Sequence, residues 1–119
     1  MRKEIEMKRI VFLNTSILTV HGKFEYRPTT VADCQKLLTD SIGNGNEILS
    51  AIGHESTANI MSDLLVYRVE MNRIVYKQEK DDTCIVFKMR GRPPEGKILS
   101  FEEIEKIGYD FGILEMIPD

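Results

Sequence analysis

The most constraining feature of this chain is a short, unbroken apolar run near its start, from Ile10 to Leu13. The run is rich in β-branched and aromatic side chains, which favour a strand. Polar residues do not alternate with the apolar ones, as they would in a strand with one face in water. The run therefore predicts a strand that other parts of the chain cover on both faces.

Three helices are expected, each preceded by residues that cap helix N-termini. A capping side chain accepts a hydrogen bond from a free backbone N–H, and an acidic residue three positions later completes a capping box. Ser100 and Glu103 have this spacing, and Thr30 and Asp33 resemble a variant of it. Apolar residues recur at helical spacing in residues 31–38 and in residues 60–65. The helices are expected over residues 31–38, 58–66 and 101–107.

The remaining patterned segments are predicted to be strands, over residues 24–27, 69–78, 83–89 and 109–117. Pro28 is expected to end the first of them. The charged turn at residues 79–82 predicts that the two strands beside it form an antiparallel hairpin. Residues 48–52 fit either a helical turn or a short strand, and residues 41–46 fit a flexible link.

These elements indicate an α/β fold with a single compact domain. We expect a mixed β-sheet of about five strands, flanked by about three helices. The first six residues are charged and lack a periodic pattern. The domain is therefore expected over residues 7–119, behind a short N-terminal tail at residues 1–6.

Composition argues against several classes of function. The net charge of −3 disfavours a protein that coats long nucleic acids with a broad basic face. No apolar run has the length of a membrane span, and no signal peptide opens the chain. Cys34 and Cys84 lack metal spacing, and no metal site is expected. Reduced, buried thiols would fit a cytoplasmic protein. The phosphate-binding P-loop and the dinucleotide-binding glycine motif are both absent.

The strongest candidate for a functional site is the stretch at residues 50–57, Ser-Ala-Ile-Gly-His-Glu-Ser-Thr. His54 follows a glycine, and Ser56 and Thr57 open the helix beyond it. His54 should then lie beside free backbone N–H groups, which attract anions. A histidine there can exchange a proton with a bound phosphate ester. The alternative is a structural histidine with hydroxyls that only cap the helix, which is the more frequent case for such a stretch taken alone.

Two loops offer further ligand-binding groups. The first is Asn14-Thr15-Ser16, because loops at strand ends often carry binding residues. A turn stabilised by Asn14 would explain it equally well. The second, residues 90–97, contains two arginines and a lysine among glycines and prolines. It fits either a phosphate clamp, since arginine binds phosphate oxygens with paired donors, or a rigid solvated linker.

The order of these motifs resembles a known family. After Asn-Thr-Ser come Ile-Gly-His-Glu-Ser-Thr, then Asn72-Arg73, then Arg-Pro-Pro-Glu-Gly-Lys-Ile-Leu at residues 92–99. The chain resembles, from about Met7 to Ile117, the viral ring nucleases that act as anti-CRISPR proteins against type III systems, together with their cellular and mobile-element relatives. The Gly-His-x-Ser-Thr and Glu-Gly-Lys-Ile-Leu elements are specific as a set.

The resemblance implies a two-fold symmetric homodimer that binds cyclic tetra-adenylate at its interface. It also implies metal-independent cleavage of the 3′–5′ phosphodiester bonds of this second messenger, with no cofactor, which would switch off type III CRISPR signalling. In the family the histidine of the Gly-His motif is catalytic and matches His54. The functional arginine and glutamate before Gly-Lys match Arg92 and Glu95, and the arginine of the Asn-Arg pair matches Arg73.

The first loop and the segment after Arg92 depart from the family pattern. Asn14 and Ser16 look like the family's asparagine and serine, but in a loop shorter than in the archaeal viral members. Pro93-Pro94 stands where viral members often carry a leucine and an acidic residue, a change that would stiffen the loop. The expected substrate-binding residues are Asn14, Ser16, Gly53, Ser56, Thr57, Arg73 and Arg92.

The expected chemistry uses the nucleophile that RNA itself carries. The 2′-oxygen attacks phosphorus and leaves a 2′,3′-cyclic phosphate, while His54 protonates the departing 5′-oxygen. General acid catalysis of this kind contributes about 10²–10⁴-fold. Arg92 would stabilise phosphate charge. Glu95 would orient Arg92 or act on the 2′-hydroxyl, and we favour orientation.

Other functions fit the same sequence. A non-catalytic module that sequesters a cyclic nucleotide would keep the arginines and the dimer groove. A regulatory or protein-interaction domain of a mobile element would need His54 only as a helix cap. A general ribonuclease is less favoured, because net negative charge disfavours capture of long RNA.

Overall fold

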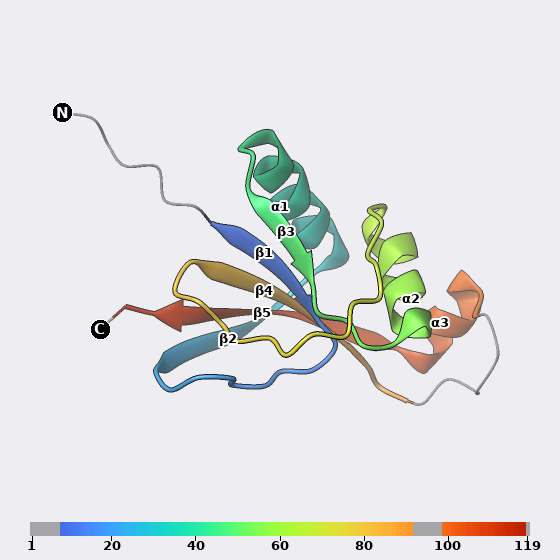
Figure 1. The fold of residues 1–119 in the computed structure, drawn as a ribbon. Coiled ribbons are helices and arrows are strands. Elements are labelled where there is room, and N and C mark those ends of the chain that lie inside the picture. Colours follow the sequence, from blue (N-terminus) through green and yellow to red (C-terminus); the bar gives the residue numbers. More distant parts are fainter. Residues whose placement is uncertain (1–7, 92–98, 119) are drawn as a thin grey trace.

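Five strands form one mixed sheet in the order β2-β5-β4-β1-β3 (Figure 1). The computed structural model describes residues 8–91 and 99–118 of the 119-residue chain. β1 runs parallel to both of its neighbours, β3 and β4, whereas β5 is antiparallel to β4 and to β2. The strands are β1 (Arg9–Leu13), β2 (Lys23–Thr29), β3 (Glu47–Ser50), β4 (Asp82–Met89) and β5 (Tyr109–Ile117).

Helices cover one face of this sheet (Figure 1). They are α1 (Val31–Gly43), α2 (Glu55–Leu65) and α3 (Phe101–Ile107). Phe12 and Phe87 of the sheet share a buried cluster with Leu38 of α1, Met61 of α2 and Ile104 of α3. Full burial of such a side chain contributes about 1.5–3 kcal/mol, so this cluster is the main core of the domain.

Irregular chain covers the opposite face. Val11, Leu13 and Cys84 lie there in a second buried cluster, against which Tyr76 packs. Tyr76 belongs to the coil that links α2 to β4. β1 is therefore buried on both faces, as its unbroken apolar sequence predicts, and the α/β fold with a mixed five-stranded sheet and three helices is confirmed.

Two of the three predicted helix starts, at Thr30 and Ser100, are also confirmed, whereas α2 begins at Glu55, before Ser56 and Thr57. The Thr30 hydroxyl accepts a hydrogen bond from the Asp33 N–H over 3.1 Å. Ser100 and Glu103 form the complete capping box at the start of α3, and Gly108 follows the helix end at a φ of 84°. Each cap satisfies a backbone N–H that the first turn of a helix leaves free.

Residues 69–78 do not form the expected strand, and the expected hairpin is wrong. In this segment only Met71 makes a bridge, an isolated parallel one to Ile52. β4 has no edge for a hairpin partner, because β1 and β5 occupy both of its sides. The alternation in the sequence instead reflects a coil that buries Gln78 and half-buries Tyr76 while neighbouring residues face solvent.

Several element boundaries differ from expectation. Pro28 lies inside β2 instead of ending it, because β2 is an edge strand, where a residue without an N–H is tolerated. α1 continues to Gly43, so the link shrinks to residues 44–46, and residues 47–50 are a strand, not a helical turn. The expected tail at residues 1–6 lies outside the described residues. Among the described residues, no helix is long and apolar enough to cross a bilayer.

Candidate functional site

Three parallel strands end at the same end of the sheet, and the loops that follow them begin there. Asn14 is the first residue after β1, Gly53 and His54 follow β3, and Arg90 follows β4. Ser16 lies in the same first loop as Asn14. In open α/β sheets, ligands bind in the crevice outside the carboxyl ends of the strands. The fold thus brings the predicted first loop and the His54 stretch to the end where a ligand site is expected.

His54 is the N-cap residue of α2, with extended backbone angles (φ −128°, ψ 128°). Its carbonyl oxygen accepts the first helical hydrogen bond, from Ala58 N–H over 3.1 Å. Its side chain makes no capping bond and is exposed. The imidazole therefore lies at the positive end of a helix, where backbone N–H groups and the helix dipole favour an anion.

Ser56 and Thr57 lie within the first turn of α2, after its N-cap residue. The helix begins at Glu55, and the N-cap position belongs to His54. Ser56 is exposed and Thr57 is half-buried. The interpretation that these hydroxyls only cap the helix is therefore wrong, and their role as substrate ligands stays a prediction. Glu55 adds a negative charge at this helix end, which a bound phosphate would have to face.

Arg73 reaches the same place from the coil after α2. Its Nε donates a hydrogen bond to the carbonyl oxygen of Gly53 over 3.0 Å. The side chain is exposed, and its remaining guanidinium N–H groups have no hydrogen-bond or ion-pair partner among the described residues. A guanidinium has five N–H donors, so most of them stay available for a ligand beside His54.

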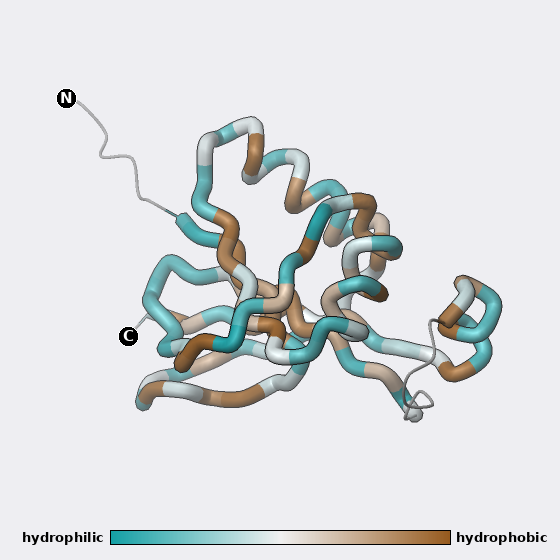
Figure 2. The backbone as a smooth tube through the Cα atoms, turned by 45° about the vertical axis from the view of Figure 1, so that its right-hand side comes forward, coloured by the Kyte–Doolittle hydropathy of each residue, from teal (hydrophilic) through white to brown (hydrophobic). Residues whose placement is uncertain are grey.

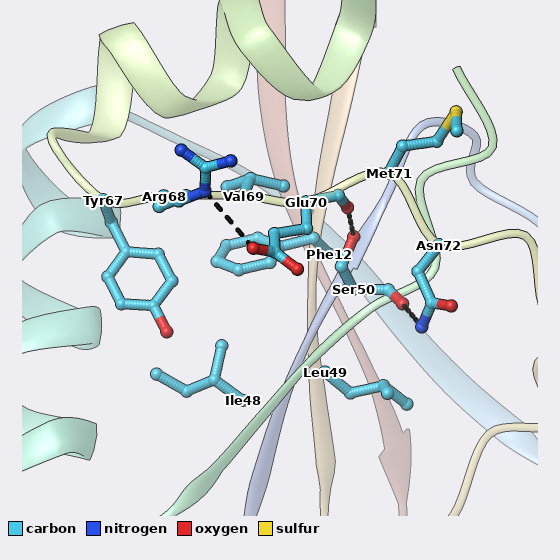
Figure 3. A pocket seen from close by; sticks show the side chains of 10 residues that line it. All are labelled: Phe12, Ile48, Leu49, Ser50, Tyr67, Arg68, Val69, Glu70, Met71 and Asn72. Atoms are coloured by element: carbon cyan, nitrogen blue, oxygen red, sulfur yellow. Dashed lines mark hydrogen bonds and ion pairs between the residues drawn. The ribbon is translucent and has the colours of Figure 1, made fainter. Parts of the chain in front are cut away.

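Hydrogen bonds between the end of β3 and the coil after α2 fix the residues that precede Arg73 (Figure 3). Asn72 donates its backbone N–H to the Ile52 carbonyl and its side-chain amide to the Ser50 carbonyl, both over 2.8 Å. The Ser50 hydroxyl in turn donates to the Glu70 carbonyl over 2.5 Å. The coil carrying Arg73 is thereby fixed along the stretch that leads from β3 into His54.

The predicted phosphate clamp at residues 90–97 is only partly described. Arg90 forms a paired hydrogen bond with Asp110, with distances of 2.7 and 3.2 Å. Its backbone N–H also donates to the Gly108 carbonyl over 2.9 Å. Arg90 is therefore engaged with β5 and is not a free phosphate ligand. Arg92 and Glu95 lie outside the described residues, and their roles stay predictions.

Several side chains with shifted pKa values lie at the opposite end of the sheet, where β1 and β4 begin. Asp82 is 2% exposed, accepts two hydrogen bonds from Arg9 (2.8 and 2.7 Å), and accepts a third from the Tyr76 hydroxyl (2.5 Å). Burial alone would raise the pKa of Asp82, but these bonds lower it below its ordinary value. Burial, followed by the bond to Asp82, raises the pKa of Tyr76. This cluster lies at the starts of β1 and β4, so we regard it as structural.

Reasoning from residue patterns did not identify Ser50 and Asn72 as the pair that aligns the site. Their bonds involve backbone carbonyls, which leave no periodic signal in a sequence. The adjacency of Asn72 to Arg73 was the only available sign. In residues 8–91 and 99–118, no group of three or more potential ligands among histidine, cysteine, aspartate and glutamate could hold a metal ion.

Comparison with known proteins gives a consistent family. A family model described as STIV B116-like matches residues 10–111. The chain is 32% identical to the uncharacterised protein YddF of Bacillus subtilis (strain 168) over 105 residues, covering 88% of this chain and 94% of YddF. It is 27% identical over 113 residues to the uncharacterised protein 26 of a Sulfolobus islandicus filamentous virus, covering 91% and 92% of the two chains.

A solved structure shares the fold. B116 of Sulfolobus turreted icosahedral virus matches with a TM-score of 0.73 and 23% sequence identity, over 91% of this chain and 98% of B116. At this level of identity the match concerns the fold alone. The relatives therefore include viral proteins as well as a protein from a bacterial genome.

Proposed function

This chain belongs to the STIV B116-like family, and we propose that it is a metal-independent ring nuclease that cleaves cyclic tetra-adenylate. One observation carries the proposal. An exposed histidine with no side-chain partner among the described residues lies at a helix N-terminus, beside an arginine bonded to the preceding residue. The pairing of a proton donor with anion-binding groups suits phosphodiester cleavage.

The proposed reaction needs little from the protein beyond positioning and one proton. The 2′-oxygen attacks phosphorus and gives up its proton to solvent, while the bond from phosphorus to the 5′-oxygen breaks. His54 donates a proton to that 5′-oxygen. The products carry a 2′,3′-cyclic phosphate and a 5′-hydroxyl. Holding the 2′-oxygen in line with the leaving group removes much of the entropic barrier.

The remaining groups would bind the charged phosphate. Free backbone N–H groups at the start of α2 and the unpaired donors of Arg73 would both donate hydrogen bonds to a bound anion. Asn14 and Ser16, at the end of the adjacent parallel strand, would bind phosphate or ribose. Arg92 and Glu95 keep the roles that the family resemblance implies, with Glu95 orienting Arg92.

We further propose that two copies share one ring. A two-fold dimer presents one His54 to each of two opposite phosphates of a symmetric cyclic tetranucleotide. Exposed apolar side chains support association, because Leu18 and Val75 are 60% and 91% exposed. The coil segments that carry them are joined by a 2.8 Å bond from Gln78 N–H to the Thr19 hydroxyl. Apolar stretches occur outside the strands and helices as well as within them (Figure 2).

The deciding experiment incubates the purified full chain with cyclic tetra-adenylate in a metal chelator and resolves the products by chromatography. His54→Ala is compared with His21→Ala, a matched control, because His21 is an exposed turn residue beside the opposite edge of the sheet. We expect ring loss with wild type and His21→Ala, and none with His54→Ala. The products should end in a 2′,3′-cyclic phosphate or its hydrolysed form.

Other outcomes would point to other functions. Tight binding of an intact ring by the wild-type chain would indicate sequestration or a different ring size. A melting temperature unchanged by cyclic oligonucleotides would favour a regulatory or protein-interaction module, since a ligand that binds the folded state raises it. Either result would overturn the proposed cleavage of cyclic tetra-adenylate. A positive result would support the proposed role as a cytoplasmic switch for type III CRISPR signalling.

A further inference from the structure

A pocket of about 590 Å³ lies beside the open edge of β3, within the size range of roughly 300–1,000 Å³ typical of small-molecule sites (Figure 3). Ile48, Tyr67 and Val69 give it an apolar wall, and Ser50 and Asn72 give it a polar side. The Tyr67 ring is backed by Phe12, with ring centroids 5.9 Å apart. The pocket thus combines a flat aromatic surface with an adjacent strand edge.

The backbone of β3 presents hydrogen-bonding groups to this pocket. Ala51 N–H donates to Phe12 on β1, so alternate residues of β3 face β1 and the residues between them face outward. The outward set includes Ile48 and Ser50. The Ser50 carbonyl is occupied by Asn72, but the Ile48 carbonyl and the Ser50 N–H have no partner in the described part of the chain.

This free edge is too short to accept another strand. The coil at residues 70–72 already occupies the outward groups from the Ser50 carbonyl through Ile52. Arg68 and Glu70 form an exposed ion pair beside the remaining gap, over 3.2 Å. Charged side chains at an edge oppose strand pairing. What remains is one acceptor and one donor, next to an aromatic ring.

We propose that this pocket is an adenine-recognition site. The Ile48 carbonyl accepts a hydrogen bond from the exocyclic amino group of the base, and the Ser50 N–H donates to ring atom N1. The base lies against Tyr67, because aromatic side chains stack on nucleobases regardless of sequence while hydrogen bonds to the base edge give selectivity. Inosine and guanine present an acceptor and a donor in the reverse order, so the same backbone pair disfavours them.

The pocket and the candidate cleavage site are linked through the coil that carries Asn72 and Arg73. Asn72 lines the pocket, and the next residue, Arg73, bonds to Gly53 immediately before His54. A base held at β3 would therefore lie beside the coil that carries Arg73 to the residue before His54. The choice of adenine rests on the proposed function, and it would explain how this chain recognises adenylate through backbone groups.

The first test uses the wild-type chain labelled with ¹⁵N and titrated with AMP and, separately, with IMP. We expect AMP to shift the amide resonance of Ser50 and to bind about tenfold more tightly than IMP, the loss expected when a hydrogen-bonding pair is reversed. Equal affinity for AMP and IMP, or shifts confined to residues away from β3, would overturn the adenine site.

The second test uses a matched pair of variants. Ser50→Ala and Ser50→Pro both remove the hydroxyl, but only proline also removes the N–H, and an outward-facing edge position tolerates proline. We expect AMP to bind Ser50→Pro about tenfold more weakly than Ser50→Ala. Equal affinity of two folded variants would remove Ser50 N–H from the site. If Ser50→Pro does not fold, binding of 1-deaza-AMP to the wild-type chain replaces this variant, because 1-deaza-AMP lacks the N1 acceptor. We expect 1-deaza-AMP to bind about tenfold more weakly than AMP. Equal affinity for the two nucleotides would overturn the site.

Cleavage of cyclic tetra-adenylate is measured in parallel, so the two proposals fail separately. Cleavage without discrimination between AMP and IMP overturns the adenine site and leaves the nuclease. Tighter binding of AMP than of IMP, with a shift of the Ser50 amide but without cleavage of cyclic tetra-adenylate, supports the adenine site and overturns the nuclease proposal. No cleavage together with no AMP binding overturns both.

Discussion

Arg73 donates a hydrogen bond from Nε to the carbonyl oxygen of Gly53 over 3.0 Å, and so brings an arginine to the residue immediately before His54. The two partners come from different segments, the coil after α2 and the coil after β3. A side chain held at one nitrogen by a backbone acceptor still has its terminal N–H groups to offer. The bond therefore orients a cation toward the helix start without neutralising it.

Replacement of Arg73 should weaken the binding of cyclic tetra-adenylate. Arginine contacts with a charged group are worth about 1.5–3 kcal/mol, so Arg73→Ala should raise Kd by roughly 10- to 100-fold. The Kd of Arg73→Lys should lie between those of the wild type and Arg73→Ala, because lysine keeps the charge but lacks the planar guanidinium. Calorimetry in the His54→Ala background measures binding without turnover.

Arg27→Ala is the matched control for Arg73. Arg27 is also partly exposed, but it forms ion pairs with Glu25 and Glu115 at 2.9 and 2.7 Å on the distant edge of the sheet. Exposed pairs of this kind contribute little to stability. Binding by Arg73→Ala equal to that of Arg27→Ala would remove Arg73 from the site.

Asn72→Ala should disturb the placement of Arg73 more than it disturbs the fold. The change removes the 2.8 Å bond to the Ser50 carbonyl but keeps the backbone bond to Ile52. One lost hydrogen bond costs about 1–2 kcal/mol, which would lower Tm by several degrees. Cleavage by the folded protein at a temperature well below Tm should still fall more than tenfold, because small misplacements in active sites are costly.

Asn59→Ala serves as the control, since Asn59 is an exposed position within α2 where alanine favours the helix. Its Tm and cleavage rate should stay at wild-type values. A cleavage rate for Asn72→Ala that matches the control would show that Asn72 does not position the site.

Sequence patterns predicted correctly those elements in which the type of side chain depends directly on burial or on helix capping. The run at Ile10–Leu13 is buried on both faces, and the capping residues Thr30 and Ser100 begin helices. The alternation at residues 69–78 predicts a strand, but the segment is a coil, because alternation depends only on which side chains are buried. Whether a strand forms depends on a free sheet edge, and the sequence does not show that β1 and β5 take both sides of β4.

The candidate site was predictable only in part. A glycine and a histidine before a helical pattern indicate His54 at a helix start, and the structure has it there. The approach of Arg73 to Gly53 had no pattern behind it, because a bond to a backbone carbonyl does not constrain the type of the accepting residue. Only the family resemblance linked these two segments. The proposed roles of Arg92 and Glu95 still rest on the family resemblance.

Asp82 should contribute strongly to the stability of the fold, through polar contacts outside the apolar core. It is 2% exposed and bonded to Arg9, Tyr76 and the Glu79 N–H. Asp82→Asn leaves Arg9 without its main partner, and breaking a buried pair costs about 3–5 kcal/mol. The free energy of unfolding in urea should fall by this amount at pH 7. Asp81→Asn, at an exposed neighbouring position, should change it little.

The pH dependence of this loss follows from the lowered pKa of Asp82 in the folded state. A carboxyl whose pKa is depressed by folding contributes its full stabilisation above its unfolded value, about 3.9. The contribution disappears as pH falls through the folded pKa. The stability difference between wild type and Asp82→Asn should therefore be constant from pH 7 down to about pH 5 and shrink below pH 4. A difference that persists undiminished at pH 2 would contradict this account.

The Cys84 thiol should report the opening of the coil that covers its face of the sheet. It is fully buried, and burial raises its pKa to about 11, although the Tyr76 hydroxyl 3.3 Å away acts in the opposite direction. Little thiolate is present at pH 8, so labelling of the folded protein should be slow and should require local opening.

Tyr76→Phe should accelerate the labelling of Cys84 selectively. The change removes the hydroxyl that ties the coil to Asp82, so the coil opens more often while the helical face stays closed. Cys34 is an internal control, because it is equally buried, has a pKa raised to about 11, and lies in the cluster on the helical face. Mass spectrometry of iodoacetamide-labelled peptides measures both rates in one sample. Equal acceleration of the two thiols would indicate global unfolding, and the coil would then not be an independently opening unit.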